Sequence, residues 1–288
     1  MSPVSHDAAG RESLGRLRVS IVCYDSAETQ LRETVATLVE ACRLCLEGGY
    51  LASVEIVLVD NGPPGRERQK LERIMAGGGE VPGVHMRCCG SGENIGFGAG
   101  HNLSIDASTS DFHLILNPDV ELAADSLRQA LAFMGAHADC GVVVPMVAND
   151  AGEPEYLCKR YPSVLDLLLR GFAPVWLRAR FRQRLDHYEM RDVLGDDVVW
   201  RPTLVSGCFM LTRAAVLARL RGFDPAYFLY FEDYDLSLRA HAVTRVAYVP
   251  DVRVVHHGGY AASKGWRHIV LFVRSAFAFF RRHGWKWC

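Results

Sequence analysis

Three acidic residues lie in an aromatic stretch late in the chain. Glu232, Asp233 and Asp235 belong to FLYFEDYDLSLRAH, residues 228 to 241. Carboxylates packed against aromatic rings lose part of their hydration, which raises their proton affinity toward that of a general base. The same charges could instead only cap a helix and interact with its dipole. The stretch therefore predicts either a general base or an acidic helix start.

Two apolar runs that are typical of buried strands end in polar residues. Tyr24 and Asp25 follow the run RLRVSIVC, and Asp60 and Asn61 end the run SVEIVLVDN. At either place the polar groups could merely satisfy backbone donors in a turn. Ligands of open α/β sheets bind at the carboxyl ends of the strands, so several such ends together favour a ligand site.

The segment HLILNPDVEL, residues 113 to 122, is a further apolar run, and it is interrupted by Asn117, Pro118 and Asp119. Proline cannot donate to a sheet ladder, and it drives the preceding residue toward extended geometry. We therefore expect a strand that ends here with Asp119 at its carboxyl edge, followed by a helix-like tail.

Two adjacent histidines end the later apolar run VRVVHH. His256 and His257 would point to opposite faces of a strand, so only one of them would face a given site. A neutral imidazole is a good metal ligand, but a histidine at a strand end is often only a polar terminus. A metal site would need one of these histidines to lie close to Asp119.

Two short motifs have less specific meanings. GFGAG, residues 96 to 100, follows the third expected strand and is preceded by Asn94, whereas a dinucleotide fingerprint follows the first strand. It could be an ordinary loop or a cradle for phosphate or sugar. Cys42 and Cys45 form a C-x-x-C inside a helical pattern, where two small apolar residues are more plausible than a zinc or redox site.

The elements that must position these residues alternate between strands and helices. The patterns predict strands at 16–25, 53–61, 84–89, 111–117 and 140–150, and helices at 29–49, 67–79 and 123–137. Parallel strands need crossovers, which helices usually supply, so the first half predicts a doubly wound α/β sheet of the nucleotide-binding kind.

The composition excludes several classes of protein. The chain has 288 residues, 49% of them hydrophobic, and a formal net charge of -1, which gives no general electrostatic attraction to nucleic acid. Nine scattered cysteines fit a reducing compartment. The first ten residues do not resemble a secretory signal, and no apolar run is long enough to span a bilayer. We expect a cytoplasmic protein.

Two segments are both basic and aromatic. Residues 163 to 185 and the tail RHIVLFVRSAFAFFRRHGWKWC, residues 267 to 288, combine arginines with large apolar side chains. This pattern is typical of a helix on a membrane surface, but a terminal helix that docks on its own domain would also produce it. The presence of two such segments favours the membrane surface slightly.

Seven motifs together resemble the family 2 glycosyltransferases, especially the rhamnosyltransferase-like branch. They are VSIVCYDS, LVDNG, ENIGFGAGHN, LILNPDV, VSGCFML, GFDPAYFLYFEDYDLSLR and VVHHGG, and they cover residues 18 to 260 in order. The resemblance implies a GT-A fold, which has a Rossmann-like, mainly parallel mixed sheet flanked by helices. It also implies sugar transfer with inversion at the anomeric carbon.

The resemblance divides the chain into a flexible N-terminus (1–15), a GT-A domain (16–264) and a basic-aromatic helix (265–288). Within the domain, residues 16–120 would be the nucleotide-binding half and residues 121–264 the acceptor and catalytic half. The donor-binding residues implied by the resemblance are Tyr24, Asp25, Asp60, Asn61, Asn94, Gly96, Gly98, Asn102, Asn117, Ser206 and Gly207.

The resemblance also implies the reacting groups. Asp233 would be the catalytic base with Glu232 beside it, and Asp119 would match the last aspartate of the Asp-x-Asp motif, which holds a divalent metal on the diphosphate. The metal would be Mg²⁺ or Mn²⁺, with His256 or His257 as a further ligand. The family motif places a histidine before the glycines, which slightly favours His257. Because Asn117 replaces the first aspartate, metal affinity could be lower.

The resemblance favours dTDP-L-rhamnose as the donor, with UDP-hexoses and GDP-sugars as alternatives. The acceptor would be a glycan or lipid-linked saccharide of polysaccharide, O-antigen or cell-wall assembly, at the inner face of the cytoplasmic membrane. A nucleotidyltransferase would need a basic, Gly-rich loop after the first strand, which CYDSAETQ lacks. A non-catalytic carbohydrate-binding protein of the same fold is the remaining rival.

Overall fold

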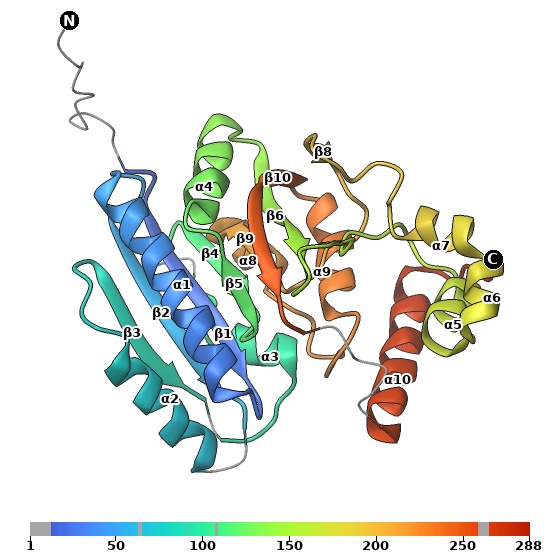
Figure 1. Ribbon diagram of the computed structural model, residues 1–288, viewed down its shortest axis with the longest axis horizontal. Coiled ribbons are helices and arrows are strands. Elements are labelled where there is room, and N and C mark those ends of the chain that lie inside the picture. Colours follow the sequence, from blue (N-terminus) through green and yellow to red (C-terminus); the bar gives the residue numbers. More distant parts are fainter. Residues whose placement is uncertain (1–12, 63–64, 91, 107–108, 259–264) are drawn as a thin grey trace, which may run out of the picture.

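The apolar runs of the sequence become the strands of one central sheet (Figure 1). The computed structural model describes residues 13–62, 65–90, 92–106, 109–258 and 265–288. The strands are β1 (Arg16–Cys23), β2 (Ser53–Asp60), β3 (Val84–Cys89), β4 (Phe112–Leu116), β5 (Val120–Leu122), β6 (Cys140–Ala148), β7 (Pro154–Glu155), β8 (Val199–Trp200), β9 (Phe209–Arg213) and β10 (Arg245–His256).

The helices are α1 (Glu28–Glu47), α2 (Arg66–Gly77), α3 (Phe97–Asn102), α4 (Ser126–Ala136), α5 (Val164–Phe172), α6 (Val175–Arg180), α7 (Arg182–Tyr188), α8 (Ala214–Leu220), α9 (Glu232–His241) and α10 (Trp266–His283). Some helices connect the strands, and α5, α6, α7 and α10 lie together to one side of the sheet (Figure 1). Among the described residues, none of these helices has the length and hydropathy needed to cross a membrane.

The first half of the sheet is parallel. β1 pairs in parallel with β2 on one side and with β4 on the other, and β2 pairs in parallel with β3. β1 is buried along nearly its whole length, as expected for a central strand that helices cover on both faces. The carboxyl ends of β1, β2 and β4 therefore meet at one edge of the sheet, which we call the site edge.

The second half of the sheet is mixed. β9 pairs antiparallel with both β4 and β6, and β10 runs parallel to β6. β10 thus has the direction of β4 and ends at the site edge, whereas β9 begins there. The predicted mixed α/β sheet is confirmed, although the parallel pairs are concentrated in its first half.

One local prediction is wrong. The residues after Asp119 do not form a helix-like tail, because Val120–Leu122 is the short strand β5, which pairs antiparallel with β10. In this pairing Val120 lies opposite His256. Cross-strand pairing here outweighs the local pattern, and it brings the chain segment after Pro118 next to the end of β10.

Two apolar layers cover the sheet. α1 and α4 pack on one face, and α8 and α9 contribute to a second cluster with Met210 and Val246. Cys42 and Cys45 are buried within the first layer, and burial raises the pKa of the Cys45 thiol to about 12. These two cysteines are core residues, as the pattern of α1 predicted.

The predicted boundaries of the segments 1–15, 16–264 and 265–288 fall partly outside the described residues. Of the expected flexible segment 1–15, residues 1–12 lie outside the described part, while the Leu14 N–H donates to the Tyr50 carbonyl at 3.0 Å. The boundary at residue 264 also lies outside the described residues. The expected C-terminal helix is present as α10, and α5, α6 and α7 lie near it (Figure 1).

Candidate active site

The ends of β1 and β2 lie side by side at the site edge. Cys23 is in register with Asp60, so Tyr24 and Asp25 emerge beside Asp60. Asp25 has a positive φ of 49°, and the Tyr24 side chain is 54% exposed. Asp60 is buried and accepts a hydrogen bond from the Gly62 N–H at 3.2 Å. This arrangement leaves an exposed ring above a buried carboxylate.

Asn61 ties the end of β2 to the glycine-rich loop. Its Nδ2 donates to Asn94 Oδ1 and to the Gly96 carbonyl, both at 3.2 Å, and its Oδ1 accepts from the Ile95 N–H at 2.9 Å. Asn94 Oδ1 also accepts from the Gly96 N–H at 3.0 Å. Two predicted residues, Asn61 and Asn94, therefore shape the loop through side-chain amides.

Gly96 connects this loop to the segment before α9. Its φ is 94°, and a Cβ here would lie 2.3 Å from the Phe228 carbonyl oxygen. The next residue, Phe97, donates its N–H to the same oxygen at 3.0 Å. Glycine is required because both the conformation and the space exclude a side chain. The loop and the acidic segment of α9 are thus joined directly.

Two other predicted donor residues have structural surroundings. A Cβ on Gly98 would lie 2.7 Å from the Phe223 Cβ, so this glycine allows close packing. The Asn102 side chain donates to the Phe223 carbonyl and accepts from the Phe223 N–H, both at 2.9 Å. Both polar groups of Asn102 are thus engaged with the backbone of Phe223, and a role of Asn102 in donor binding stays a prediction.

Asp119 and His256 meet at the site edge. His256 Nε2 lies 3.5 Å from Asp119 Oδ1 and 3.5 Å from Asn117 Nδ2, while His256 Nδ1 lies 3.3 Å from Glu155 Oε2. Burial lowers the pKa of His256, but the hydrogen bonds and charges of Asp119 and Glu155 outweigh it and raise the pKa to about 9. Pro118 ends β4 at the place where Asp119 reaches this imidazole.

His257 lies on the other side of the strand end. Its Nε2 is 2.8 Å from Glu121 Oε1, and its Nδ1 is 2.5 Å from Asp150 Oδ1. The structure therefore brings the imidazole of His256, and not that of His257, to the Asp119 carboxylate, whereas the His257 N–H donates to the Asp119 carbonyl at 2.9 Å. The slight preference for His257 is replaced by His256, because the pairing of β5 with β10 decides which face each histidine occupies.

Gly258, a further residue of the site, lets the Asp119 carboxylate approach the backbone closely. A Cβ at Gly258 would lie 2.1 Å from Asp119 Oδ2 and 3.2 Å from His256 Nε2. Asn117 Oδ1 is buried and accepts no hydrogen bond from the described part of the chain. Carboxylate, imidazole and a carbonyl oxygen without a donor suit a divalent cation. The signal in the sequence was the glycine after the histidines.

Asp233 is held at the start of α9 by backbone donors. Its Oδ2 accepts from the Gly207 N–H at 3.2 Å, and its Oδ1 accepts from the Tyr234 N–H at 2.8 Å. Gly207 belongs to the turn before β9, in which Ser206 Oγ accepts from the Cys208 N–H at 3.3 Å. Since β9 begins at the site edge, Asp233 is brought there as well.

The adjacent carboxyls differ in proton affinity. Burial raises the pKa of Asp233 to about 6, although the N–H groups of Gly207 and Tyr234 oppose the rise. Burial and the charge of Asp233 raise the pKa of Glu232 well above its ordinary value. Glu232 is 5% exposed, and its Oε2 has no hydrogen-bond partner among the described residues. Asp233 is therefore the carboxyl of the pair that ionises near neutral pH.

The backbone directly before Glu232 and Asp233 has an unusual conformation that the sequence did not predict. Tyr230 and Phe231 have φ values of 69° and 67°, and Phe231 is the residue before the first turn of α9. Aromatic residues rarely adopt this conformation, and such strain is found at functional sites where the surroundings impose it. The aromatic residues of α10 supply these surroundings, with Phe272 at a ring-centroid distance of 5.2 Å from Phe231.

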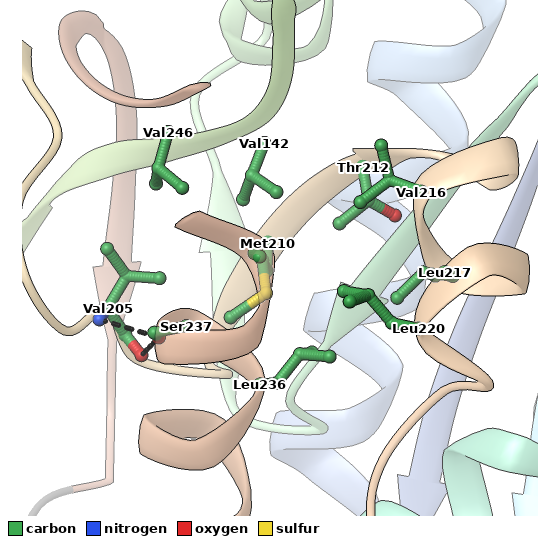
Figure 2. Close-up of a pocket in the computed structure, with 11 residues that line it drawn as sticks. Val142, Val205, Met210, Thr212, Val216, Leu217, Leu220, Leu236, Ser237 and Val246 are labelled. Atoms are coloured by element: carbon green, nitrogen blue, oxygen red, sulfur yellow. Dashed lines mark hydrogen bonds between the residues drawn. The ribbon is translucent and has the colours of Figure 1, made fainter. Parts of the chain in front are cut away.

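Figure 2 shows a closed cavity beneath α8 and α9 that does not belong to the site. Its volume is about 10 Å³, and mostly apolar side chains such as Val142, Met210 and Leu236 line it. It is therefore too small for a nucleotide. Ser237 Oγ at its wall accepts from the Val205 N–H at 3.0 Å, which fixes the turn before Gly207 on α9. Its one hydroxyl proton has two possible acceptors, the Asp233 carbonyl at 2.6 Å and the Val205 carbonyl at 3.3 Å.

Two rhamnosyltransferases are similar to this chain in sequence. An N-acetylglucosaminyl-diphospho-decaprenol L-rhamnosyltransferase of Mycobacterium tuberculosis is 27% identical over 254 residues, which cover 81% of this chain and 76% of that protein. The rhamnosyltransferase WbbL of Escherichia coli is 26% identical over 177 residues, which cover 58% of this chain and 62% of WbbL.

Solved structures share the fold at low sequence identity. A mannosyltransferase from Pyrobaculum calidifontis in complex with GDP-Man and Mn²⁺ has a TM-score of 0.59 and 18% identity, over 98% of this chain and 67% of that one. GalNAc-T7 with UDP, GalNAc and Mn²⁺ has a TM-score of 0.57 and 14% identity, over 84% of this chain and 43% of that one. The fold is that of the GT-A glycosyltransferases.

A match to a family covers most of the sheet. Residues 19–216 match the family described as glycosyl transferase family 2, and this range contains the loop at Gly96, the Asn-Pro-Asp segment and the turn at Gly207. The match spans more than half of the 288 residues. The chain is a glycosyltransferase and belongs to glycosyl transferase family 2.

Proposed function

We propose that the protein transfers L-rhamnose from dTDP-L-rhamnose, with inversion at the anomeric carbon, to a hydroxyl of a glycan or a lipid-linked saccharide. The observation that carries the reaction type is the partly buried Asp233, which two backbone N–H groups orient and whose pKa is raised to about 6. The donor is supported by two relatives whose names describe rhamnosyl transfer.

The proposed reaction is a single displacement with Asp233 as general base. The acceptor oxygen forms a bond to the anomeric carbon as the bond between that carbon and the diphosphate oxygen breaks. Asp233 accepts the proton of the acceptor hydroxyl, and the nucleoside diphosphate leaves with the bonding electrons. Glu232 remains protonated, so it adds no second charge beside Asp233.

We assign the donor nucleotide to the strand ends. Tyr24, Asp25 and Asp60 would contact the base and ribose, because an exposed ring and two carboxylates lie together at the ends of β1 and β2. The loop that Asn61 and Asn94 shape would lie beside the diphosphate and sugar. Ser206 and Gly207 would border the sugar on the side of Asp233.

A divalent ion, Mg²⁺ or Mn²⁺, would be held by Asp119 and His256, with Asn117 beside them. When bound, it would neutralise charge on the departing diphosphate as a Lewis acid. No group of three or more His, Cys, Asp or Glu side chains that could hold a metal occurs within the described parts of the chain. We therefore expect the diphosphate and water to supply the remaining ligands.

A donor screen tests this proposal. Purified protein is incubated with an acceptor saccharide and dTDP-L-rhamnose, a UDP-hexose or a GDP-sugar, and nucleoside diphosphate release is measured with and without EDTA. We expect release from dTDP-L-rhamnose that EDTA and Asp119→Ala both reduce. Release from another donor would overturn the rhamnose assignment, and full activity in EDTA would overturn the metal assignment.

The anomeric configuration of the product tests inversion separately. NMR of the isolated glycoside should give the configuration opposite to that of the donor. A retained configuration would contradict the single displacement. A non-catalytic binding protein would release no nucleoside diphosphate with any donor and would bind saccharide equally well after Asp233→Asn.

A further inference from the structure

Helix α10 has an apolar face that packs on the segment carrying Asp233. His268 Nδ1 lies 2.9 Å from the Tyr230 hydroxyl, and Ser275 Oγ donates to the Leu229 carbonyl at 2.8 Å. The Phe279 ring lies 5.3 Å from that of Phe231. These contacts account for one side of the helix, which is the side expected of a docked terminal helix.

The opposite side of α10 is also apolar, and it is exposed. The side chains of Trp266, Val270, Val273 and Phe277 are 75%, 46%, 56% and 57% exposed. Their spacings of four, three and four residues place them in one stripe along the helix. A helix that is apolar on two opposite sides needs a second apolar partner, and nothing in the described part of the chain covers this stripe.

The stripe continues into the C-terminal residues. The Trp285 ring lies 5.6 Å from that of Phe277 and stacks on Trp287 at 5.2 Å. The Trp287 carbonyl accepts from the Leu165 N–H at 3.2 Å, which joins the C-terminus to α5. α5, α6 and the segments beside them expose four further large apolar side chains: Leu168, Phe172, Val175 and Trp176.

Cationic residues border the stripe. Arg267, Arg274 and Arg281 recur every seven residues on α10, are exposed, and form no ion pair with the described residues. Arg274 and Arg281 line a surface hollow together with Phe277. The segment 265–288 contains no aspartate or glutamate. The surface thus offers positive charge and aromatic side chains with no acidic neighbour on its own segment.

We propose that this surface binds the headgroup region of an anionic phospholipid membrane. The interfacial patch, as we call it, consists of Trp266, Arg267, Val270, Val273, Arg274, Phe277, Arg281, Trp285 and Trp287. Aromatic residues favour the boundary between water and acyl chains, and the arginines complement anionic lipid. Since no described helix can cross a membrane, the contact is a surface contact.

The position of the patch relates it to the active site. One side of α10 would face the membrane while the other contacts residues 229–235, so Asp233 would be held close to the lipid surface. This consequence rests on the proposed function, because a lipid-linked acceptor would present its sugar at that surface. Membrane binding itself requires no turnover and can be tested without a donor or an acceptor.

Vesicle flotation of the full chain tests the patch. Vesicles of phosphatidylcholine alone are compared with vesicles of equal parts phosphatidylcholine and phosphatidylglycerol. We expect the wild type to float with the anionic vesicles and much less with the neutral ones. The triple variant R267Q/R274Q/R281Q should bind anionic vesicles about a hundredfold more weakly at low salt, and W266S/V273S/F277S should bind both kinds more weakly.

A matched control carries the same charge change outside the patch. R66Q/R219Q/R253Q removes three exposed arginines and should float like the wild type. Circular dichroism melting shows which variants are folded. Failure of the wild type to float with anionic vesicles would overturn the proposal, and so would flotation of both patch variants equal to that of the wild type. So would a dimer in sedimentation that W266S/V273S/F277S converts to monomer without changing flotation, because a second copy would then cover the stripe.

Discussion

The Gly207 N–H donates to Asp233 Oδ2 at 3.2 Å, across 26 residues of sequence. This bond links the turn before β9 with the start of α9. A Cβ at Gly207 would also lie 3.6 Å from the Asp233 Cβ and 3.2 Å from the Phe97 ring. Because β9 runs antiparallel between β4 and β6, the turn before it lies at the site edge, where it contacts both the glycine-rich loop and the proposed base.

The raised pKa of Asp233 predicts an acidic limb in the pH profile. Burial raises this pKa to about 6, so the carboxyl is protonated below that pH and cannot accept the acceptor's proton. We expect kcat/KM to fall about tenfold per pH unit below pH 6 and to be nearly level just above it. Initial rates across the pH range check this. A level profile down to pH 4.5 would contradict the assignment of the base.

A side chain at Gly258 should weaken the activation of the enzyme by a divalent metal. In Gly258→Ala the new Cβ would fall 2.1 Å from Asp119 Oδ2, so the carboxylate must move. We expect the Mn²⁺ concentration for half-maximal activity to rise about 10- to 100-fold. Gly171→Ala is the control, because nothing lies within 4 Å of its Cβ position. Equal Mn²⁺ titrations for the two variants would argue against the metal site.

Ser237→Ala should affect both stability and catalysis. Ser237 Oγ accepts from the buried Val205 N–H, as Figure 2 shows. Its one hydroxyl proton has two possible acceptors, the Asp233 carbonyl at 2.6 Å and the Val205 carbonyl at 3.3 Å. Loss of the hydroxyl leaves that N–H without a partner, at a cost of about 1–3 kcal/mol in the free energy of unfolding. We also expect a lower kcat, because the turn that carries Gly207 is no longer fixed on α9.

Ser126→Ala is a matched control for this change. Ser126 is also buried and donates to a backbone carbonyl, that of Arg253, but it lies on α4. Urea unfolding should show destabilisation of both variants, whereas kcat should fall only for Ser237→Ala. An equal kcat for the two variants would mean that the Ser237 bond serves stability alone.

The third acidic residue of the aromatic stretch has a structural role. Asp235 is fully buried, accepts from Arg239 Nε at 2.6 Å, and pairs with His283 Nε2 of α10 at 2.8 Å. We expect Asp235→Asn to lower the free energy of unfolding by about 3 kcal/mol, because the mostly buried guanidinium of Arg239 loses its carboxylate partner. Urea denaturation measures this, and an unchanged midpoint would contradict the role.

Unlike Asp235→Asn, Asp233→Asn should not lower the free energy of unfolding at pH 7. A folded-state pKa raised to about 6 means that folding disfavours the ionised carboxylate, so the contribution of Asp233 to stability is lost as pH rises through 6. At pH 7 the neutral asparagine should therefore leave the free energy of unfolding unchanged or raise it.

The sequence predicted the elements that local patterns determine. Buried strands show as apolar runs, and Pro118 marks the end of β4 because it cannot join a ladder. The helix-like tail after Asp119 was wrong, and the choice between His256 and His257 was unsettled, for one reason. Both depend on the pairing of β5 with β10, a contact between residues more than 130 positions apart.

Other features were hidden because they arise from packing. The positive φ values of Tyr230 and Phe231 come from surroundings that include α10, and no local pattern in FLYFEDYD announces them. The amide of Asn102 donates to the Phe223 carbonyl, 121 residues away, a contact that no local pattern predicts. The apolar residues of α10 suggested either a helix docked on its own domain or a helix on a membrane surface. In the structure the helix has a docked apolar side and an exposed apolar side.

The most direct test of the account is the transfer rate of Asp233→Asn at saturating donor, with donor binding measured by calorimetry. Glu232→Gln is the matched control, because glutamine resembles the protonated Glu232. We predict that Asp233→Asn binds donor like the wild type but transfers sugar about 10²- to 10⁴-fold more slowly, while Glu232→Gln stays active. A rate for Asp233→Asn within about threefold of the wild type would contradict Asp233 as the general base.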